Sequence, residues 1–360
     1  MRSLFRPGYG SRRLSKDNRP HIPDKSGNVH PNKTLPTRAI LAAIAVLALV
    51  ICGCANAPKM YRVGILIGAD TMEAIAEGFQ ARMTELGYVE GKNIAYDIRR
   101  SNADPAAEKR IASNFVTSKV DLVFAFPGQP ASVVKTAVRG TKIPIVFANA
   151  IIEGADLVDS VRNPGENITG VRNPGPGLAL KSFESLLELI PGATRVMVIY
   201  NPTYPTNRFV IEALRSVASS HRVTLQEVRI TNVADTQAAL QGLEKSGARM
   251  SAVLLFPDLI TRSSEASGAI IRFADEHRVP VAGGPPTLVQ NGAVLSATID
   301  RREQGSLAAS LADKILTGTP ASSIPVVTTQ PHLFINYKKA RELGLTVPEG
   351  LLKQATEIIR

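Results

Sequence analysis

After residue 60, short apolar runs rich in β-branched residues alternate with longer segments whose apolar residues recur at helical spacing. The run at 61–67 predicts a buried strand. The segment 71–86 predicts a helix, because Ile75, Phe79 and Met83 fall on one face. This alternation is typical of parallel sheets covered by helices on both faces. We therefore predict an α/β fold built from doubly wound parallel sheets.

The same pattern divides the chain into two blocks. In the first block we predict strands at 61–67, 93–98, 121–126 and 143–149, with helices at 71–86, 105–117 and 130–139. In the second block we predict strands at 195–200, 223–230, 251–256 and 279–282, with helices at 178–190, 205–220, 235–246 and 263–277.

Between the blocks, Val-Arg-Asn-Pro-Gly occurs at 161–165 and again at 171–175. We interpret this repeat as two turns around a short strand rather than as a functional duplication, since Asn-Pro-Gly is ordinary turn chemistry. The segment is a natural crossover from one block to the other.

The remainder of the chain is expected to cross back and then return. A strand at 293–298 and a helix at 302–317 should rejoin the first block, with Asp300 and Glu303 as a capping box. Residues 325–328 should cross once more, and helices at 337–343 and 348–359 should close the fold. We thus expect lobe 1 at 61–170 plus 293–324 and lobe 2 at 171–292 plus 325–360.

Residues 1–54 are expected to be a basic leader followed by a lipoprotein-type signal. Residues 39–52 form an apolar run of 14 residues, shorter than the roughly 20 that a membrane span needs. Cys54, preceded by Gly53 and by Ile51 further back, resembles a bacterial lipobox, in which this cysteine is acylated and becomes the mature N-terminus. The alternatives are an uncleaved hydrophobic anchor and a plain signal peptide cut near Ala55.

The formal charge of +11 lies mainly in the leader, because residues 1–38 carry +7 and the rest of the chain only +4. The folded part therefore needs no nucleic acid as a partner. After Cys54 we find no cysteine and only three histidines. Two of these, His221 and His277, fall near predicted helix C-termini, where a structural role is favoured. No nucleophile elbow, phosphate loop or metal-binding motif is present, so we expect no enzyme, cofactor or metal.

Several spaced motifs carry a family resemblance. They are Gly-Tyr-Val-Glu-Gly-Lys-Asn at 87–93, Asn-Ile-Thr-Gly-Val at 167–171, Lys-Ile-Leu-Thr-Gly at 314–318 and Asn-Tyr-Lys-Lys-Ala at 336–340. Together they resemble the substrate-binding proteins of ABC transporters for tryptophan and tyrosine uptake. The resemblance runs from about Tyr61 to the C-terminus. It implies a type I periplasmic-binding-protein fold, in which two lobes joined by three hinge crossovers close on a small ligand.

Two loops depart from the family pattern. Pro127-Gly128-Gln129 stands where the family usually has Gly-Thr-Pro, and the segment 149–154 replaces an acidic-proline-valine loop. Both loops should face the cleft. The resemblance alone therefore does not fix the ligand class of this chain.

Candidate site residues follow from the rule that open parallel sheets bind ligands beyond the carboxyl ends of their strands. This rule selects Gly68, Ala69, Asp70, Gly128, Gln129, Asn149, Asn201, Tyr204, Asn207, Asp258, Gly283 and Gly284. A ligand carboxylate would take backbone N–H groups near Gly128 and Gln129, and an ammonium would need Asp258 or Asp70. Asp70 has a second interpretation as the cap of the helix that follows, and Tyr204 either forms a turn or stacks on a ligand ring.

The resulting hypothesis is a lipid-anchored solute-binding protein of an ABC importer, in the periplasm or at the cell surface. We expect a monomer that binds an amino acid or similar small molecule and docks on a membrane permease when closed. The alternatives are a sensor of the same fold that signals to a receptor, and an enzyme on the same scaffold.

Overall fold

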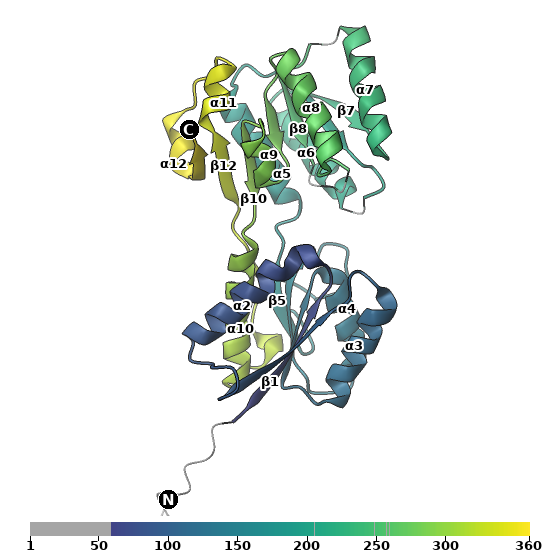
Figure 1. The fold of residues 1–360 in the computed structure, drawn as a ribbon, viewed down its shortest axis with the longest axis vertical. Helices are drawn as coiled ribbons and strands as arrows, with labels where there is room; N and C mark the ends of the chain where they lie inside the picture. Colours follow the sequence, from purple (N-terminus) through teal and green to yellow (C-terminus); the bar gives the residue numbers. More distant parts are fainter. Residues whose placement is uncertain (1–58, 205, 248, 257, 259) are drawn as a thin grey trace, which may run out of the picture. The chain divides into compact units, whose positions relative to one another are not determined.

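The computed structural model describes residues 59–360 except 205, 248, 257 and 259. All of these residues belong to one unit, Pro58–Arg360. The leader, the apolar run and the proposed acylation site Cys54 lie outside the described residues. Within the unit, the helices and strands gather around two sheets (Figure 1).

The first sheet has the strand order β2-β1-β3-β4-β5-β11, and every pair in it is parallel. Its strands are β1 (Tyr61–Ile67), β2 (Ile94–Arg100), β3 (Leu122–Phe126), β4 (Ile145–Ala150), β5 (Ile168–Arg172) and β11 (Val327–Thr328). The helical segments of this lobe are η1 (Asp70–Met72), α2 (Glu73–Glu85), α3 (Pro105–Thr117), α4 (Gly128–Ala137), α10 (Arg301–Leu316) and η2 (Ala321–Ser323).

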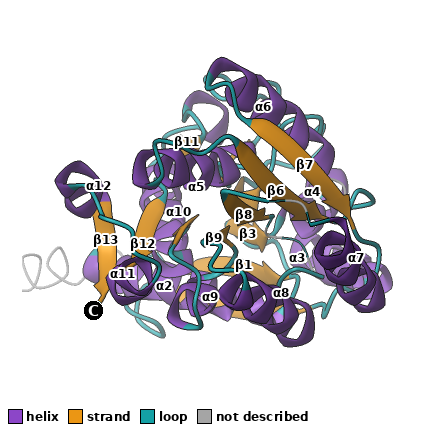
Figure 2. Ribbon diagram, turned by 90° about the horizontal axis from the view of Figure 1, so that it is seen from above, coloured by secondary structure: helices purple, strands orange, loops and turns teal. Residues whose placement is uncertain are grey.

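The second sheet has the order β7-β6-β8-β9-β10-β12-β13, and β10 with β12 is its antiparallel pair. Its strands are β6 (Arg195–Tyr200), β7 (Thr224–Arg229), β8 (Ala252–Leu255), β9 (Val281–Gly283), β10 (Leu295–Thr298), β12 (His332–Asn336) and β13 (Ala355–Ile359). Its helices are α5 (Pro176–Leu189), α6 (Asn207–Ser220), α7 (Val233–Ser246), α8 (Ser264–Glu276), α9 (Pro286–Gln290), α11 (Tyr337–Glu342) and α12 (Glu349–Gln354). The last two helices lie beside β12 and β13 (Figure 2).

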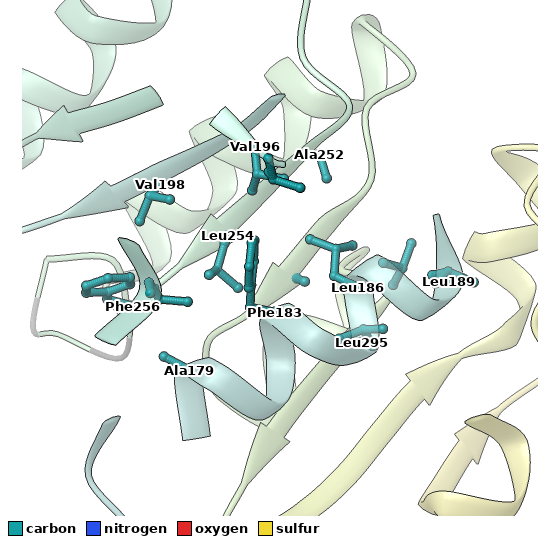
Figure 3. Close-up of a cluster of buried hydrophobic side chains, with 14 of the residues drawn as sticks. Ala179, Phe183, Leu186, Leu189, Val196, Val198, Ala252, Leu254, Phe256 and Leu295 are labelled. Atoms are coloured by element: carbon teal, nitrogen blue, oxygen red, sulfur yellow. The ribbon is translucent and has the colours of Figure 1, made fainter. Parts of the chain in front are cut away.

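The apolar face of α5 forms much of the core of the second lobe. Phe183 and Leu186, three residues apart on the helix, are fully buried against Val198 of β6 and Leu254 of β8 (Figure 3). Burying side chains of this size contributes about 1.5–3 kcal/mol each. The helical spacing of apolar residues in the sequence therefore corresponds to the packed face of the helix.

Three segments carry the chain between the sheets. They connect β5 to α5, β10 to α10, and β11 to β12. Helix α10 packs on α2, β4 and β5, so the chain returns to the first lobe before its last crossing. The predicted fold class, two doubly wound α/β lobes with three crossovers, is confirmed.

The strand near 293–298 lies in the second sheet and not in the first lobe, where we expected it. Leu295 pairs with Ala282 of β9, and β10 also pairs with β12. A short apolar strand fits either sheet locally, so long-range pairing decides its place. From the observed pairing we infer lobe boundaries at 59–172 plus 301–328 and at 176–298 plus 332–360.

One further local prediction was wrong. The expected closing helix at 348–359 ends at Gln354 and continues as strand β13, whose β-branched residues pair with β12. The short helix α9, for which we made no prediction, begins at Pro286 after the N-cap residue Pro285. Proline is compatible with the first position of a helix because its missing N–H would have no partner there.

Candidate ligand-binding cleft

A cavity of about 810 Å³ is lined by residues of both lobes. This volume lies within the range of roughly 300–1,000 Å³ that is typical of small-molecule sites. Part of the wall comes from loops that follow strands, where parallel sheets offer backbone N–H groups and helix N-termini, and the rest comes from helices such as α5 and strands such as β10 and β12. The polar and charged side chains in its walls are those of Asn149, Asn173, Ser182, Tyr204, Thr206, Asn207, Arg262, Thr287, Thr298, Asp300, Arg301, His332, Thr356 and Glu357.

Of the twelve candidate residues, Asn149, Tyr204, Asn207 and Gly283 line this cavity. Gly284, which the same rule selected, lines it too. They come from the carboxyl ends of β4 and β9 and from the segment that leads from β6 into α6, so the strand-end rule brings together residues that are far apart in the sequence.

A distortion of β4 turns Asn149 toward the cavity. The register between β4 and β5 shifts between Ala148 and Ala150, and Asn149 has φ 51°. Asparagine tolerates this left-handed conformation better than most residues. Its Oδ1 accepts a hydrogen bond from Asn173 Nδ2 at 2.8 Å, and its Nδ2 lies 3.3 Å from the sulfur of Met72. The two amides form a polar wall on the first-lobe side.

Asp258, expected to meet a ligand ammonium, is fully buried and does not line the cavity. Its Oδ1 accepts the backbone N–H groups of Ile260 and Thr261, both at 3.0 Å. Its Oδ2 accepts Asn201 N at 2.8 Å and Asn207 Nδ2 at 3.0 Å. Because both oxygens of Asp258 already accept hydrogen bonds from the protein, this carboxylate holds two loops together and does not contact a ligand in the cavity.

Asn201 also serves the loop rather than the cavity. Its carbonyl oxygen accepts Asn207 Nδ2 at 2.9 Å, and its side chain accepts the N–H of Thr203 at 2.9 Å. This turn presents Tyr204 to the cavity. Both interpretations of Tyr204, a turn residue and a residue facing the ligand, are therefore compatible with its position.

The remaining candidates, Gly68, Ala69, Asp70, Gly128 and Gln129, do not line the cavity. Asp70 is exposed and does not cap α2, whose N-cap residue Met72 makes no side-chain cap hydrogen bond. Gly128 and Gln129 open α4, but Pro127 is the residue of that loop that reaches the cavity.

Gly283 and Gly284 stand where a side chain does not fit. They have φ of 88° and 80°, and a Cβ on Gly283 would overlap the carbonyl oxygen of Leu255. Glycine alone adopts such angles without strain. The backbone itself is therefore the surface that this loop offers to the cavity.

Sequence reasoning missed the charged residues of the cavity, above all Arg262 and Arg301. Arg301 is the first residue of α10, and Asp300 before it is the N-cap, which accepts Arg302 N at 2.7 Å. Burial lowers the pKa of Arg301, and the nearby charge of Arg262 lowers it further. The available signal was that Arg262 lies in the segment between β8 and α8 and that Arg301 begins a helix shortly after β10 ends.

The expected capping box at the start of α10 is only half present. Asp300 caps the helix, but Glu303 does not complete the box. Its Oε2 instead lies 2.6 Å from Nε2 of His332 on β12, across a crossover. His332 thus lines the cavity while its Nε2 contacts the carboxylate of Glu303.

The two histidines assigned structural roles do end helices. His221 and His277 are the C-cap residues of α6 and α8, and His277 Nδ1 lies 2.8 Å from Phe273 O. Across 59–360, leaving aside the four gaps, no three His, Cys, Asp or Glu side chains gather as a metal site. In that same part of the chain no helix has the length and apolar character to cross a membrane.

The model of the family "ABC transporter substrate binding protein" matches residues 62–359, nearly all of the described chain. The chain belongs to this family. Its members are binding proteins that act outside the cytoplasm, and the family resemblance recognised in the sequence is confirmed.

Comparisons with individual substrate-binding proteins agree. The chain is 25% identical to a tyrosine-binding protein of Clostridioides difficile over 294 residues, 81% of this chain and 83% of that protein. A Streptococcus pneumoniae ABC domain solved with L-tryptophan has a TM-score of 0.65 at 22% identity, covering 84% of this chain and 100% of that one. A ligand-free, open substrate-binding protein with adhesive properties from Clostridium difficile has a TM-score of 0.72 at 24% identity, covering 83% and 98%. At these identities the two structures establish the fold.

Proposed function

We propose that this protein is a lipid-anchored solute-binding protein of an ABC importer, and that it binds an amino acid or a similarly small polar molecule. The observation that carries the proposal is the cavity of about 810 Å³ whose walls come from both lobes. A ligand in that position contacts both halves of the molecule at once.

Lobe closure gives this arrangement its function. The three crossovers allow the lobes to move as bodies about short connecting segments. A ligand shifts the open–closed equilibrium only by the contacts that differ between the two states. A solute that touches Asn149 and Asn173 on one side and Tyr204 on the other gains its full set of contacts only when the lobes close.

An amino acid is the first ligand class to test. The relative from Clostridioides difficile is named for tyrosine, and the Streptococcus structure holds L-tryptophan. The cavity offers amide groups that can pair with charged ends of a ligand, and the rings of Tyr204 and Phe334 that can pack on a side chain.

The anchor and the partner complete the proposal. Acylation of Cys54 would hold the protein at the membrane surface, and the closed form would dock as a monomer on a permease. Metabolic labelling with a palmitate analogue tests the anchor. Label on the wild type and none on Cys54→Ser supports it, whereas equal labelling of both contradicts it.

Binding is tested by thermal shift and calorimetry on the full chain purified in detergent, with a panel of amino acids, aromatic acids, purines and small peptides. A ligand at 100 times its dissociation constant should add about 2.7 kcal/mol of stability. A rise in melting temperature with one chemical class supports the proposal. Turnover of the bound compound would show an enzyme instead, and no response to any compound would count against solute binding.

A further inference from the structure

We infer that the natural ligand carries two negative charges, held between the guanidinium groups of Arg262 and Arg301. This inference rests on the proposed solute-binding function and specifies its substrate class. The ligand chemistry is that of a small organic dianion, either a dicarboxylate or a phosphate monoester.

The two arginines approach the cavity from different lobes. Arg262 follows β8 in the second lobe, just before α8. Arg301 begins α10, directly after the crossover into the first lobe. Both side chains line the same cavity. A single ligand between them would therefore be held from both lobes.

Neither guanidinium has a partner among the described residues. Other arginines near the crossovers are paired, as Arg172 is with Glu153 at 2.6 Å and Arg302 is with Glu77. Arg262 and Arg301 make no such ion pair and no side-chain hydrogen bond within the described part of the chain. A guanidinium has five N–H donors, so an unpaired one in a cavity wall retains a large capacity for an anion.

The charges around the pair do not neutralise it. Burial and the charge of Arg262 both lower the pKa of Arg301. The acidic residues of the wall are Asp300, whose carboxylate accepts backbone N–H groups of α10, and Glu357, which is exposed on β13. Two cations that repel each other, with no carboxylate paired to them, are unfavourable in the empty protein. A bound anion would offset that cost.

The side-chain type narrows the ligand class. The planar fork of arginine matches the two oxygens of a carboxylate or of a phosphate in a bidentate arrangement. Two guanidinium groups that line one cavity can bind two carboxylates of one ligand, or one phosphate whose oxygens contact both groups. A ligand bridging them would also favour closure, because it meets both cations only when the lobes approach each other.

The test measures ligand binding by the full chain in detergent, using matched pairs of compounds. The dianions are succinate, glutarate and glycerol phosphate; their counterparts are succinamate, glutaramate and glycerol; L-tyrosine, L-tryptophan and L-glutamine are included. We expect at least one dianion to raise the melting temperature and its counterpart not to do so. Response to dicarboxylates alone or to the phosphate alone identifies which dianion the site accepts, and either supports the inference.

Variants show whether the two arginines are responsible. Arg262→Gln and Arg301→Gln should each weaken dianion binding by about tenfold to a hundredfold, the range of one charge-assisted contact. The ligand-free melting temperature should stay the same or rise, because a like-charge repulsion is removed. Arg110→Gln is the matched control, since this arginine is exposed on α3, away from the cavity, and should bind like the wild type.

Two results would overturn the inference. If neutral amino acids bind, dianions do not, and both Gln variants keep the wild-type affinity, the solute-binding function stands and the dianion class is wrong. If no compound of either panel binds, the proposed function fails together with the inference.

Discussion

Gly305 of α10 lies so close to Gly78 of α2 that a Cβ on Gly305 would be 3.0 Å from the carbonyl carbon of Gly78. It would also overlap the carbonyl oxygen of Ile75. Helix α10 reaches this position only after the chain has built most of the second lobe. The contact between two glycines therefore fixes the returning segment, with Arg301 at its start, to the first lobe.

Gly305→Ala should destabilise the protein by about 2–3 kcal/mol, because overpacking forces the two helix backbones apart. The free energy of unfolding in urea measures this. Gly242→Ala is the matched control, since nothing lies within 4 Å of a Cβ at this exposed position in α7. That change should stabilise by about 0.5–1 kcal/mol through helix propensity. Equal unfolding curves for Gly305→Ala and the wild type would contradict the close packing.

Asp258→Asn should reduce stability far more than it alters ligand contacts. Each carboxylate oxygen of Asp258 faces donors from the two loops, so an amide NH₂ would oppose at least one donor. A buried donor without a partner is unfavourable by about 1–3 kcal/mol.

The measurement is the unfolding free energy, together with ligand affinity at a temperature where the variant is folded. Asp70→Asn is the comparison, because Asp70 is exposed and outside the cavity and should change neither quantity. If Asp258→Asn has normal stability but no longer binds the ligand, Asp258 contacts the ligand and its assignment to a structural role is wrong.

Local periodicity is sufficient for most of the secondary structure. Strand β6 and helix α3 have the ends that the sequence predicts, because apolar spacing and the caps of these segments are local properties. The places of β10 and β13 were not predictable in this way. Strand β10 pairs with β9 and β12, and β13 pairs with β12, so backbone pairing rather than residue type assigns both strands to the second sheet.

The candidate site was predictable at the level of loops and not of side chains. The strand-end rule located Asn149 and Tyr204. It cannot distinguish a carboxylate that faces the cavity from one that accepts hydrogen bonds from loop N–H groups, as Asp258 does. Arg262 and Arg301 were missed because an arginine in a loop or at a helix start is usually solvated. Only the folded structure shows that both line one cavity.

Asn149→Ala should weaken ligand binding by about tenfold, because it removes the amide that Asn173 orients toward the cavity. Calorimetric titration with the ligand found in the panel measures the change. Gln129→Ala is the control for this loop region, since Gln129 is exposed and does not line the cavity. If Gln129→Ala weakens binding and Asn149→Ala does not, the assignment of this wall is wrong.

Glu108 is a buried acid in the first turn of α3, only 3% exposed, and its Oε2 has no hydrogen-bond partner. Burial raises the pKa of Glu108, although Ser101 acts in the opposite direction. A raised pKa means that the folded state holds this proton more tightly than the unfolded chain does. The stability contributed by the group is therefore complete below the unfolded pKa and is lost as pH rises through the folded pKa.

Glu108→Gln keeps the shape of the side chain and removes the charge, so it should be more stable than the wild type at pH 7. The difference should shrink toward pH 4, where Glu108 is protonated in the folded protein. Urea unfolding at both pH values measures it. Glu276→Gln, at an exposed position near the end of α8, should show no such pH-dependent gain. A constant difference between Glu108→Gln and the wild type at the two pH values would show that the buried carboxyl does not titrate as its burial requires.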